Sequence, residues 1–504
     1  MEYTNLHLKR NGQWTHVMVD NETTLPSMFL SIYGLNELSK KALGTQENAM
    51  VSLRFFYVYY YKKHKRTFDF DFYRSKYDVS RFIDELDGFF YYLLDKQHLN
   101  NESDILGLGF FGTVISKHNK VTYGGHIRAV GRFFKYLNLR YMNVRFQDLS
   151  PADAHDIHKN NDKTLSAKVK SFSDLEVSGN EPANRYKSIT DLQNIELNNM
   201  LIPSTPEFTD VETGEVYEVV INPQNPFNDG FEQYRNYLIH RLMYTYGLRV
   251  AECLLLTKDS IGPTLPDARG DVHYILIVQN LPDDVEDPRK RPPSLKTANS
   301  YRHIELHVDD YSLLTIYIES YRDSLFEEKE MDDHDILFIK GTGKLTPLTY
   351  DAVRTFYKNK IDPAFIALHP YYRSDKKRNI DSMVMLTPHV GRHTWAYMTL
   401  EYIYNDLLKE ELRLSKDYGI TARMKGLLDA AADQLRVLGG WSETSTMPMR
   451  YARRFIEIVA NRSNLGRTKQ SNQYVAIPEA KTNTKNDNTY TYNVLDDEGF
   501  DEFL

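Results

Sequence analysis

The sequence has few of the features that mark secreted, membrane-spanning or metal-binding proteins. It contains one cysteine, Cys253, within an apolar run, so an intrachain disulfide is excluded. No stretch reaches the roughly 18 apolar residues of a membrane span, and the first residues lack the apolar segment of a secretory signal. Neither the Cys–His spacing of a zinc site nor a GxxxxGK[ST] phosphate loop is present. We therefore expect a cytoplasmic, nucleoid-associated protein that needs no metal and no other cofactor.

The charge balance is mildly acidic. Lysine and arginine total 62 against 69 aspartate and glutamate residues, which gives a net charge of −7. Proteins that bind nucleic acid are more often basic, so the overall charge argues weakly against that class. The distribution is uneven, however, because basic residues concentrate in 289–302, 373–378 and 450–454. Local basic regions of this kind are compatible with contacts to phosphate.

The pattern of apolar residues predicts a mainly α fold with a small β-hairpin or sheet. Leu53, Phe56, Tyr57 and Tyr60 have the spacing of one buried helix face, whereas HYILIVQN and SYRHIELHV read as a pair of strands. A chain of 504 residues has room for two or three domains. We expect an N-terminal extension over 1–45, a helical domain over 46–150, a linker with local structure over 151–228, a second domain over 229–465 and a polar tail over 466–504.

Three basic residues, Arg128, Arg132 and Lys135, share one face of a helix in the first domain. Apolar residues such as Val130 and Phe134 occupy its other face. A basic stripe of this kind is usually a solvated surface, and its functional interpretation is a set of phosphate contacts. Both interpretations stay open at this point.

In the second domain, four short segments contain residues suited to chemistry on an anion. The first is YTYGLRVAECLLL, read as the end of a helix over 231–256, where Gly247 permits close approach of a backbone and Arg249 precedes Glu252 by three positions. The second is KTANSYRHIEL, in which Lys296 lies on the turn before a strand. Taken singly, these residues are more often a surface ion pair and a solvated loop lysine.

The other two segments each begin a helix. Thr387 and Pro388 are suited to a helix start, which places His389 and Arg392 on one face of the first turn, where free N–H groups also favour an anion. The last segment is LGGWSETSTMPMRYARRF, which contains Trp441 and then Tyr451 among several arginines. A tyrosine at helical spacing is more often a core residue than a nucleophile.

Taken together and in this order, the segments resemble the tyrosine recombinase (phage integrase) family. The family pattern reads here as GLR at Arg249, KT at Lys296, HVGR at His389 and Arg392, GGW at Trp441, and finally Tyr451. The resemblance covers roughly 229–460 and extends more weakly to 46–150. From His389 to Trp441 is 52 positions (441 − 389), which is longer than usual in the family, and the excess around 402–432 reads as inserted helix.

The resemblance implies an enzyme that cleaves and rejoins DNA at specific sites through a 3′-phosphotyrosyl intermediate, for integration or excision of a mobile element. A helical core-binding domain over 46–150 and the catalytic domain over 229–465 would form a clamp around duplex DNA. The implied partners are recombination sites in duplex DNA, further copies of the chain in a tetramer, and accessory proteins. The aromatic and acidic segment 490–504 would couple neighbouring subunits, unless it is simply a disordered tail.

Each residue of the pattern has an implied role. Tyr451 is the nucleophile, Arg249 and Arg392 bind the reacting phosphate, and Lys296 is the general acid for the leaving oxygen. His389 accepts a proton or binds phosphate, Trp441 offers its indole N–H, and Glu252 holds Arg249 in place. Two alternatives remain: a type IB topoisomerase-like enzyme with similar chemistry, and a catalytically silent DNA-binding accessory protein.

Overall fold

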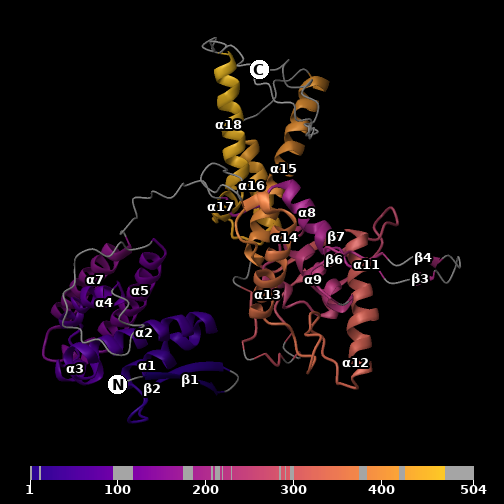
Figure 1. The fold of residues 1–504 in the computed structure, drawn as a ribbon. Helices are drawn as coiled ribbons and strands as arrows, with labels where there is room; N and C mark the ends of the chain where they lie inside the picture. Colours follow the sequence, from indigo (N-terminus) through magenta and orange to yellow (C-terminus); the bar gives the residue numbers. More distant parts are fainter. Residues whose placement is uncertain are drawn as a thin grey trace, which may run out of the picture. The chain divides into compact units, whose positions relative to one another are not determined.

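The chain folds into two compact units, Met1–Ala183 and Asn184–Leu504, which are treated separately below. Both are mainly helical with small antiparallel sheets, which confirms the expected fold class (Figure 1). No helix in the described part of the chain is long and apolar enough to cross a membrane. The computed structural model describes residues 3–10, 13–94, 117–173, 186–205, 208–209, 216–217, 220–228, 230–282, 285, 287–289, 291–295, 300–373, 383–418 and 426–470.

The first unit packs a β-hairpin against a set of helices. The hairpin strands pair from Tyr3 opposite Asp20 to Arg10 opposite Gln13. Helices α2 and α5 lie against each other at the centre of the unit, and α7 packs along α5. The elements are β1 (Tyr3–Arg10), β2 (Gln13–Asp20), α1 (Met28–Asn36), η1 (Leu38–Lys40), α2 (Leu43–His64), α3 (Phe68–Arg74), η2 (Val79–Phe82), α4 (Glu85–Leu94), α5 (Lys117–Arg140), α6 (Met142–Arg145) and α7 (Pro151–Ser173).

Aromatic residues form the core of this unit, which accounts for much of the chain's large number of tyrosines and phenylalanines. The ring of Phe56 lies 5.5 Å from those of Phe68 and Phe89 and 5.4 Å from that of Phe134, each in an edge-to-face arrangement. Such pairs are favoured by the ring quadrupoles and bury large apolar areas. The tyrosines of α2 also find polar partners, as when the Tyr57 hydroxyl donates to Asp69 at 2.6 Å.

The limits of the units differ from the expected domain boundaries. Residues 1–45 belong to the first unit, because Met18, Phe29 and Leu30 are buried in its aromatic core. The range 151–228, expected to be a linker, contributes α7 to the first unit and α8 to the second. Its polar composition concealed two helices, which bury Leu165 of α7 and Leu197 and Leu201 of α8.

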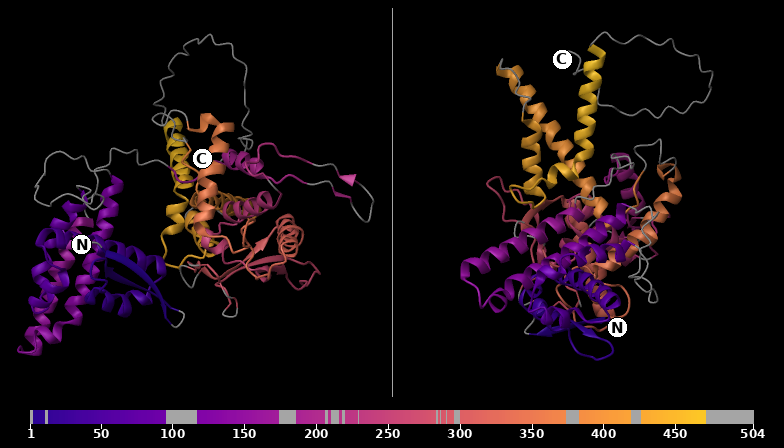
Figure 2. Two further views of the ribbon diagram at one scale, coloured as in Figure 1. Left: turned by 60° about the horizontal axis from the view of Figure 1, so that its bottom comes forward. Right: turned by 90° about the vertical axis from the view of Figure 1, so that its left-hand side faces the viewer.

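In the second unit the buried helix α9 packs against α8, α10, α11, η6 and α15, and a three-stranded sheet belongs to the same unit (Figure 2). Its elements begin with α8 (Asp191–Leu201), β3 (Phe208–Thr209), β4 (Val216–Tyr217), α9 (Gly230–Tyr244), α10 (Val250–Cys253), η4 (Lys258–Ser260), β5 (Ile261–Pro263), β6 (Tyr274–Val278), β7 (Arg302–Leu306) and α11 (Val308–Ile316). They continue with η6 (Tyr317–Asp323), α12 (Ser324–Glu328), α13 (Tyr350–Phe356), η7 (Tyr357–Ile361), α14 (Asp362–Leu368), η8 (Pro370–Arg373), α15 (Pro388–Tyr418), α16 (Leu427–Leu438), α17 (Met447–Tyr451) and α18 (Arg453–Gln470).

The sheet confirms the strand pair expected from the sequence. Strands β6 and β7 are antiparallel, with Leu276 opposite Ile304, and the short β5 adds to the other edge of β6. Val278 and Leu306 are buried on one face, so the alternation of apolar residues fixes which side covers the core. This arrangement places the start of β7, at Arg302, close to α10.

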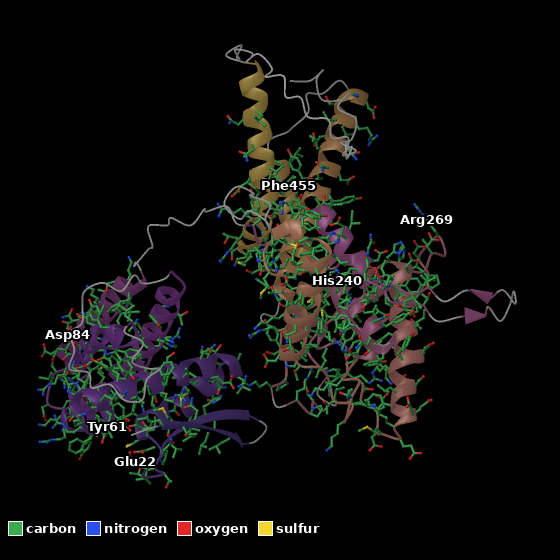
Figure 3. All side chains as sticks on the ribbon, in the orientation of Figure 1. Glu22, Tyr61, Asp84, His240, Arg269 and Phe455 are labelled. Atoms are coloured by element: carbon green, nitrogen blue, oxygen red, sulfur yellow. The ribbon has the colours of Figure 1, made fainter. Side chains whose placement is uncertain are left out.

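The C-terminal helices form a second apolar cluster of their own. Residues of α15, α16 and α18 pack around Leu400, Leu435 and Phe455, and Figure 3 labels Phe455 at the base of α18. The second half of α15 and α16 correspond to the inserted helix expected around 402–432. The tail proposed to couple subunits, 490–504, lies outside the described residues.

Candidate active site

Arg392 lies at the centre of a group of charged and aromatic side chains in the second unit. Helix α15 begins at Pro388, as the sequence predicts, so Arg392 projects from its first turns. The guanidinium is 1% exposed and donates to the carbonyl oxygens of Gly247 and Gly439. Its Cζ also lies 4.4 Å from the centre of the Trp441 ring, a favourable cation–π geometry. Burial, and then the nearby Arg249, lower the pKa of Arg392 to about 9.

The turn between α9 and α10 allows this contact. The sequence predicts one helix over 231–256, but α9 ends at Tyr244 and α10 begins at Val250. Gly247 has a φ of 69°, a conformation that side-chain-bearing residues rarely adopt. A Cβ at this position would also overlap the indole of Trp395. The close approach at Gly247 is therefore made by the Trp395 side chain and not by a backbone segment, and the continuous helix is wrong because the glycine turns the chain.

Glu252 is a buried carboxylate that gathers arginines. Its Oε2 accepts from the backbone N–H of Arg249 at 2.9 Å and from Nη2 of Arg302 at 3.0 Å, and its Oε1 accepts from Nη1 of Arg249. Burial alone would raise the pKa of Glu252, but Arg302, Arg392 and Arg249 together hold it below its usual value. The carboxylate is therefore ionised at neutral pH.

The group carries an excess of positive charge. Three arginines (Arg249, Arg302 and Arg392) against one carboxylate (Glu252) leave a formal charge of +2, from 3 − 1. Among the described residues, the buried Nε–H groups of Arg302 and Arg392 have no acceptor. Unpaired buried donors and uncompensated charge are both costly. An oxyanion such as a phosphate would offset this charge, since guanidinium groups match its oxygens in pairs.

Tyr451 ends α17 and lies among aromatic side chains next to the arginines. It is 9% exposed. Its ring centre is 4.2 Å from that of His393, 5.5 Å from that of Trp441 and 5.7 Å from that of His389. Because Trp441 also contacts Arg392, the tyrosine and the arginine cluster form one continuous group.

Both histidines beside Tyr451 favour the neutral form. Although the His389 side chain is largely accessible, the packing around it, and then Lys187 and Arg392, lower its pKa. Burial and then the neighbouring His389 lower the pKa of His393 to about 3. A neutral His389 can accept a proton, whereas the buried and stacked His393 is suited to holding the tyrosine ring.

The structure brings most of the predicted site residues together. Arg249, Glu252, Arg392, His389, Trp441 and Tyr451 all belong to the group just described. Lys296 lies outside the described residues, although Ser300 and Arg302, which follow it, are in the site. Two of the arginines that are close to Tyr451 in the sequence do not join the site, because Arg454 is buried against the carbonyl of Ser188 and Arg453 pairs with Glu457.

Arg128, Arg132 and Lys135 are exposed on α5 of the first unit, as the helical spacing predicts. Nζ of Lys135 lies 3.4 Å from a carboxylate oxygen of Asp162 on α7. Exposure is compatible with both interpretations of the stripe.

Across the described ranges, no group of three or more His, Cys, Asp or Glu side chains is arranged to hold a metal ion.

Sequence reasoning missed two residues of the group, Arg302 and His393. Each had a recognisable signal. Arg302 begins a strand whose alternation turns it, with Ile304 and Leu306, toward the core, an unusual place for a charge. His393 follows His389 by four positions and so shares its helix face.

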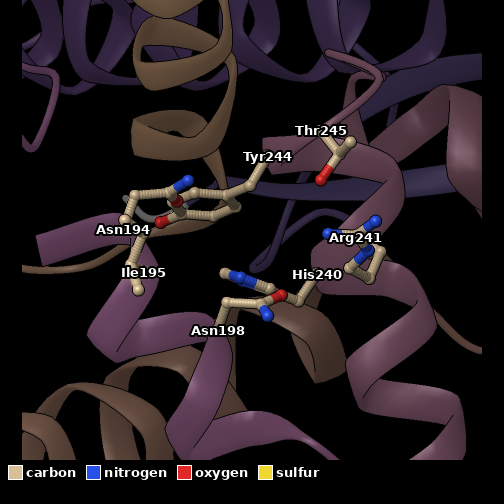
Figure 4. A pocket seen from close by; sticks show the side chains of 7 residues that line it. All are labelled: Asn194, Ile195, Asn198, His240, Arg241, Tyr244 and Thr245. Carbon is tan, nitrogen blue, oxygen red and sulfur yellow. The ribbon is translucent and has the colours of Figure 1, made fainter. Parts of the chain in front are cut away.

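A small polar cavity lies between α8 and α9, behind the group (Figure 4). Its volume is about 150 Å³. Nε2 of His240, the hydroxyl of Tyr244 and Oδ1 of Asn194 have no hydrogen-bond partner in the described part of the chain, and ordered water commonly fills such a space. The ring of Tyr244 packs against Gly391, directly before Arg392. The lining residues are Asn194, Ile195, Asn198, His240, Arg241, Tyr244 and Thr245.

Comparison with known proteins gives similarity to solved structures alone. No protein-family model matches the sequence, and no curated protein matches it. The fold is similar to that of the XerH site-specific recombinase bound to a palindromic difH substrate in a post-cleavage complex, with 13% identity over 77% of this chain and 95% of that chain and a TM-score of 0.31. A pre-cleavage complex of XerH with difH gives 13% identity, 75% and 96% coverage and a TM-score of 0.28.

Proposed function

We propose that this chain is a tyrosine-type site-specific DNA recombinase that cleaves and rejoins duplex DNA through a 3′-phosphotyrosyl intermediate at Tyr451. The supporting observation is the continuous group in which a cluster of arginines with an excess charge of +2 adjoins a buried tyrosine through Trp441. A protein that only binds DNA needs phosphate contacts but no nucleophile beside them. The conjunction of both favours catalysis over binding alone.

In the proposed reaction, the hydroxyl oxygen of Tyr451 forms a bond to the scissile phosphorus and the bond to the 5′ oxygen breaks. Arg249 and Arg392 stabilise the charge on the non-bridging oxygens, and Trp441 donates its indole N–H to the same phosphate. The neutral His389 takes the phenolic proton and, once protonated, can bind the phosphate, and Lys296 gives a proton to the leaving 5′ oxygen. The phosphotyrosyl bond keeps the energy needed for rejoining, which runs the same steps in reverse.

The proposal extends to the rest of the molecule. The first unit serves as the core-binding domain, and together with the catalytic unit it clamps duplex DNA at recombination sites. Four copies assemble on paired sites, with accessory proteins and with segment 490–504 coupling neighbours. Integration or excision of a mobile element is the use we propose for the reaction.

The test is covalent trapping on a nicked suicide substrate, with Tyr451→Phe as the variant. This variant should bind DNA with wild-type affinity and form no denaturation-resistant adduct. Tyr404→Phe is the matched control, because Tyr404 contacts Phe455 in the same apolar cluster, and it should form the adduct at the wild-type rate. An adduct in Tyr451→Phe would move the nucleophile elsewhere.

Relaxation and joining assays, added to covalent trapping, separate the two alternatives. Relaxation of supercoils without any joint product from paired sites would favour a type IB topoisomerase-like enzyme. DNA binding by the wild-type chain with neither adduct nor relaxation would favour a silent accessory protein.

A further inference from the structure

The buried arginine at the start of β7 has an arrangement that its contribution to stability does not explain. Arg302 is 9% exposed, and its Nη1 donates to the carbonyl of Ser300 at 3.0 Å. Its Nη2 donates to Oε2 of Glu252 at 3.0 Å, and its buried Nε–H has no acceptor among the described residues. A buried guanidinium with an unpaired donor stabilises a fold poorly compared with an apolar side chain of similar size.

The contacts of Glu252 show what Arg302 does for its neighbours. Oε2 already accepts two hydrogen bonds, from Arg302 and from the backbone of Arg249. Nη1 of Arg392 lies 3.9 Å from the same oxygen, beyond hydrogen-bonding distance. The other Nη contacts of Arg392 are to two backbone carbonyls, which carry no net charge. Arg392 therefore forms no hydrogen bond with Glu252, although the two groups lie within ion-pair distance.

We propose that Arg302 is a positioning residue: it neutralises Glu252 so that Arg392 remains free to bind an oxyanion. This inference rests on the proposed function, in which the oxyanion is the scissile phosphate. Without Arg302, the vacated lone pair of Glu252 attracts the Nη1 group of Arg392 across a gap of 3.9 Å. That internal ion pair competes directly with the phosphate. Arg302 acts through Glu252, so no contact between Arg302 and DNA is required.

The inference is tested with the full chain and tungstate, a phosphate-like oxyanion, by isothermal titration; the site is identified as the one weakened by Arg392→Lys. Arg302→Met should weaken tungstate binding by about tenfold or more. In Arg302→Met/Glu252→Gln the neutral amide no longer competes for Arg392, and binding should return to within about threefold of wild type. A double variant as weak as Arg302→Met would overturn the inference, because a purely structural role is not rescued by removing the carboxylate's charge.

Two further variants keep the test decisive if Arg302→Met folds poorly. Glu252→Gln alone should bind tungstate at least as tightly as wild type, since the cluster loses its one negative charge, and weaker binding would count against the inference. Arg302→Lys, which keeps the charge, should retain most of the affinity. The matched control is Arg241→Met, which breaks another arginine–carboxylate pair in the same unit, with Asp310, and should lower stability without changing tungstate binding.

Covalent trapping of the same variants separates this inference from the proposed function. The adduct should form slowly in Arg302→Met and faster in the double variant, with DNA affinity nearly unchanged. If the tungstate pattern holds but no variant, the wild type included, forms an adduct, the role of Arg302 stands and the recombinase proposal fails. If wild type cleaves DNA but Arg302→Met binds tungstate normally, the recombinase proposal stands and the role of Arg302 fails.

Discussion

At the scale of single residues, the anchoring of Arg392 explains why charge alone is not sufficient at this position. Its planar guanidinium reaches two carbonyls on different segments while lying over the Trp441 ring. Lysine carries the same charge on one compact group and cannot make both contacts. We expect Arg392→Lys to slow adduct formation in single-turnover assays by about 100-fold or more. Arg413→Lys, an exposed change on the same helix, is the control, and an equal effect of both changes would contradict the expectation.

A second prediction at this scale concerns acid stability. Burial lowers the pKa of His240 to about 3, whereas in the unfolded chain it is about 6.5. The unfolded state therefore binds an extra proton between these values, and stability is lost as pH falls from about 6.5 toward 3. His240→Gln should reduce the dependence of the unfolding free energy on pH there by up to ~1.4 kcal/mol per pH unit. Urea unfolding from pH 4.5 to 8 measures this.

Asn194→Ala, a change of a non-titrating residue in the wall of the same cavity, is the control for that measurement, because it should leave the slope unchanged. His393, whose pKa is also lowered to about 3 mainly by burial, should still contribute in the His240 variant. An unchanged slope in His240→Gln would mean that this histidine titrates similarly in both states.

Most residues of the candidate site could be recognised from the sequence, because each stands in a short motif and the motifs follow a familiar order. Arg302 and His393 could not be assigned in the same way. Their parts depend on contacts with Glu252 and Tyr451, which lie 50 and 58 positions away along the chain. Local spacing indicates which face a residue takes but does not identify its distant partner.

At the scale of elements, the turn at Gly247 is the feature most sensitive to change. Gly247→Ala would introduce a strained backbone, costing roughly 1–2 kcal/mol, and a clash with Trp395, costing about 1–3 kcal/mol more. Because the Gly247 carbonyl holds Arg392, adduct formation should also fall. Denaturant unfolding and single-turnover trapping measure the two effects.

Gly343→Ala is the matched control for this turn. Gly343 has a similar φ of 64°, but a Cβ there meets nothing within 4 Å. The Gly343→Ala variant should therefore lose only the stability that the backbone strain costs, and it should keep full activity. Equal losses of stability in the two variants would show that contact with Trp395 is unimportant.

Elements with strong local signals were predictable, and those defined by long-range packing were not. The start of α15 at Pro388 and the pairing of β6 with β7 follow from capping residues and alternation. The break after Tyr244 was missed because apolar periodicity continues across it, and only the glycine marks the turn. Residues 1–45 read as an extension because their apolar residues stand in short segments, and the burial of Met18, Phe29 and Leu30 depends on helices elsewhere in the first unit.

At the scale of the whole molecule, the net charge of −7 and the proposed partner are reconciled by local charge. We expect the affinity for duplex DNA to fall steeply as salt rises. A plot of the logarithm of the binding constant against the logarithm of the salt concentration should have a slope of about −0.9 for each phosphate contact. Arg132→Ala on α5 should reduce this slope by about 1. Lys135→Ala should change it less, because Asp162 already offsets that charge. A flat salt response of the wild-type chain would count against duplex binding.

The support of Arg392 by backbone oxygens has a consequence for how this sequence can diverge over evolution. Every residue type supplies a carbonyl, so no substitution at Gly247 or Gly439 can delete the acceptor itself. What selection must preserve is space, since a Cβ at these glycines would overlap Trp395 and Trp441 respectively. Among descendants of a common ancestor, each glycine and its tryptophan should therefore change together, with a bulkier residue tolerated at 247 or 439 only where the facing indole has been replaced by a smaller side chain.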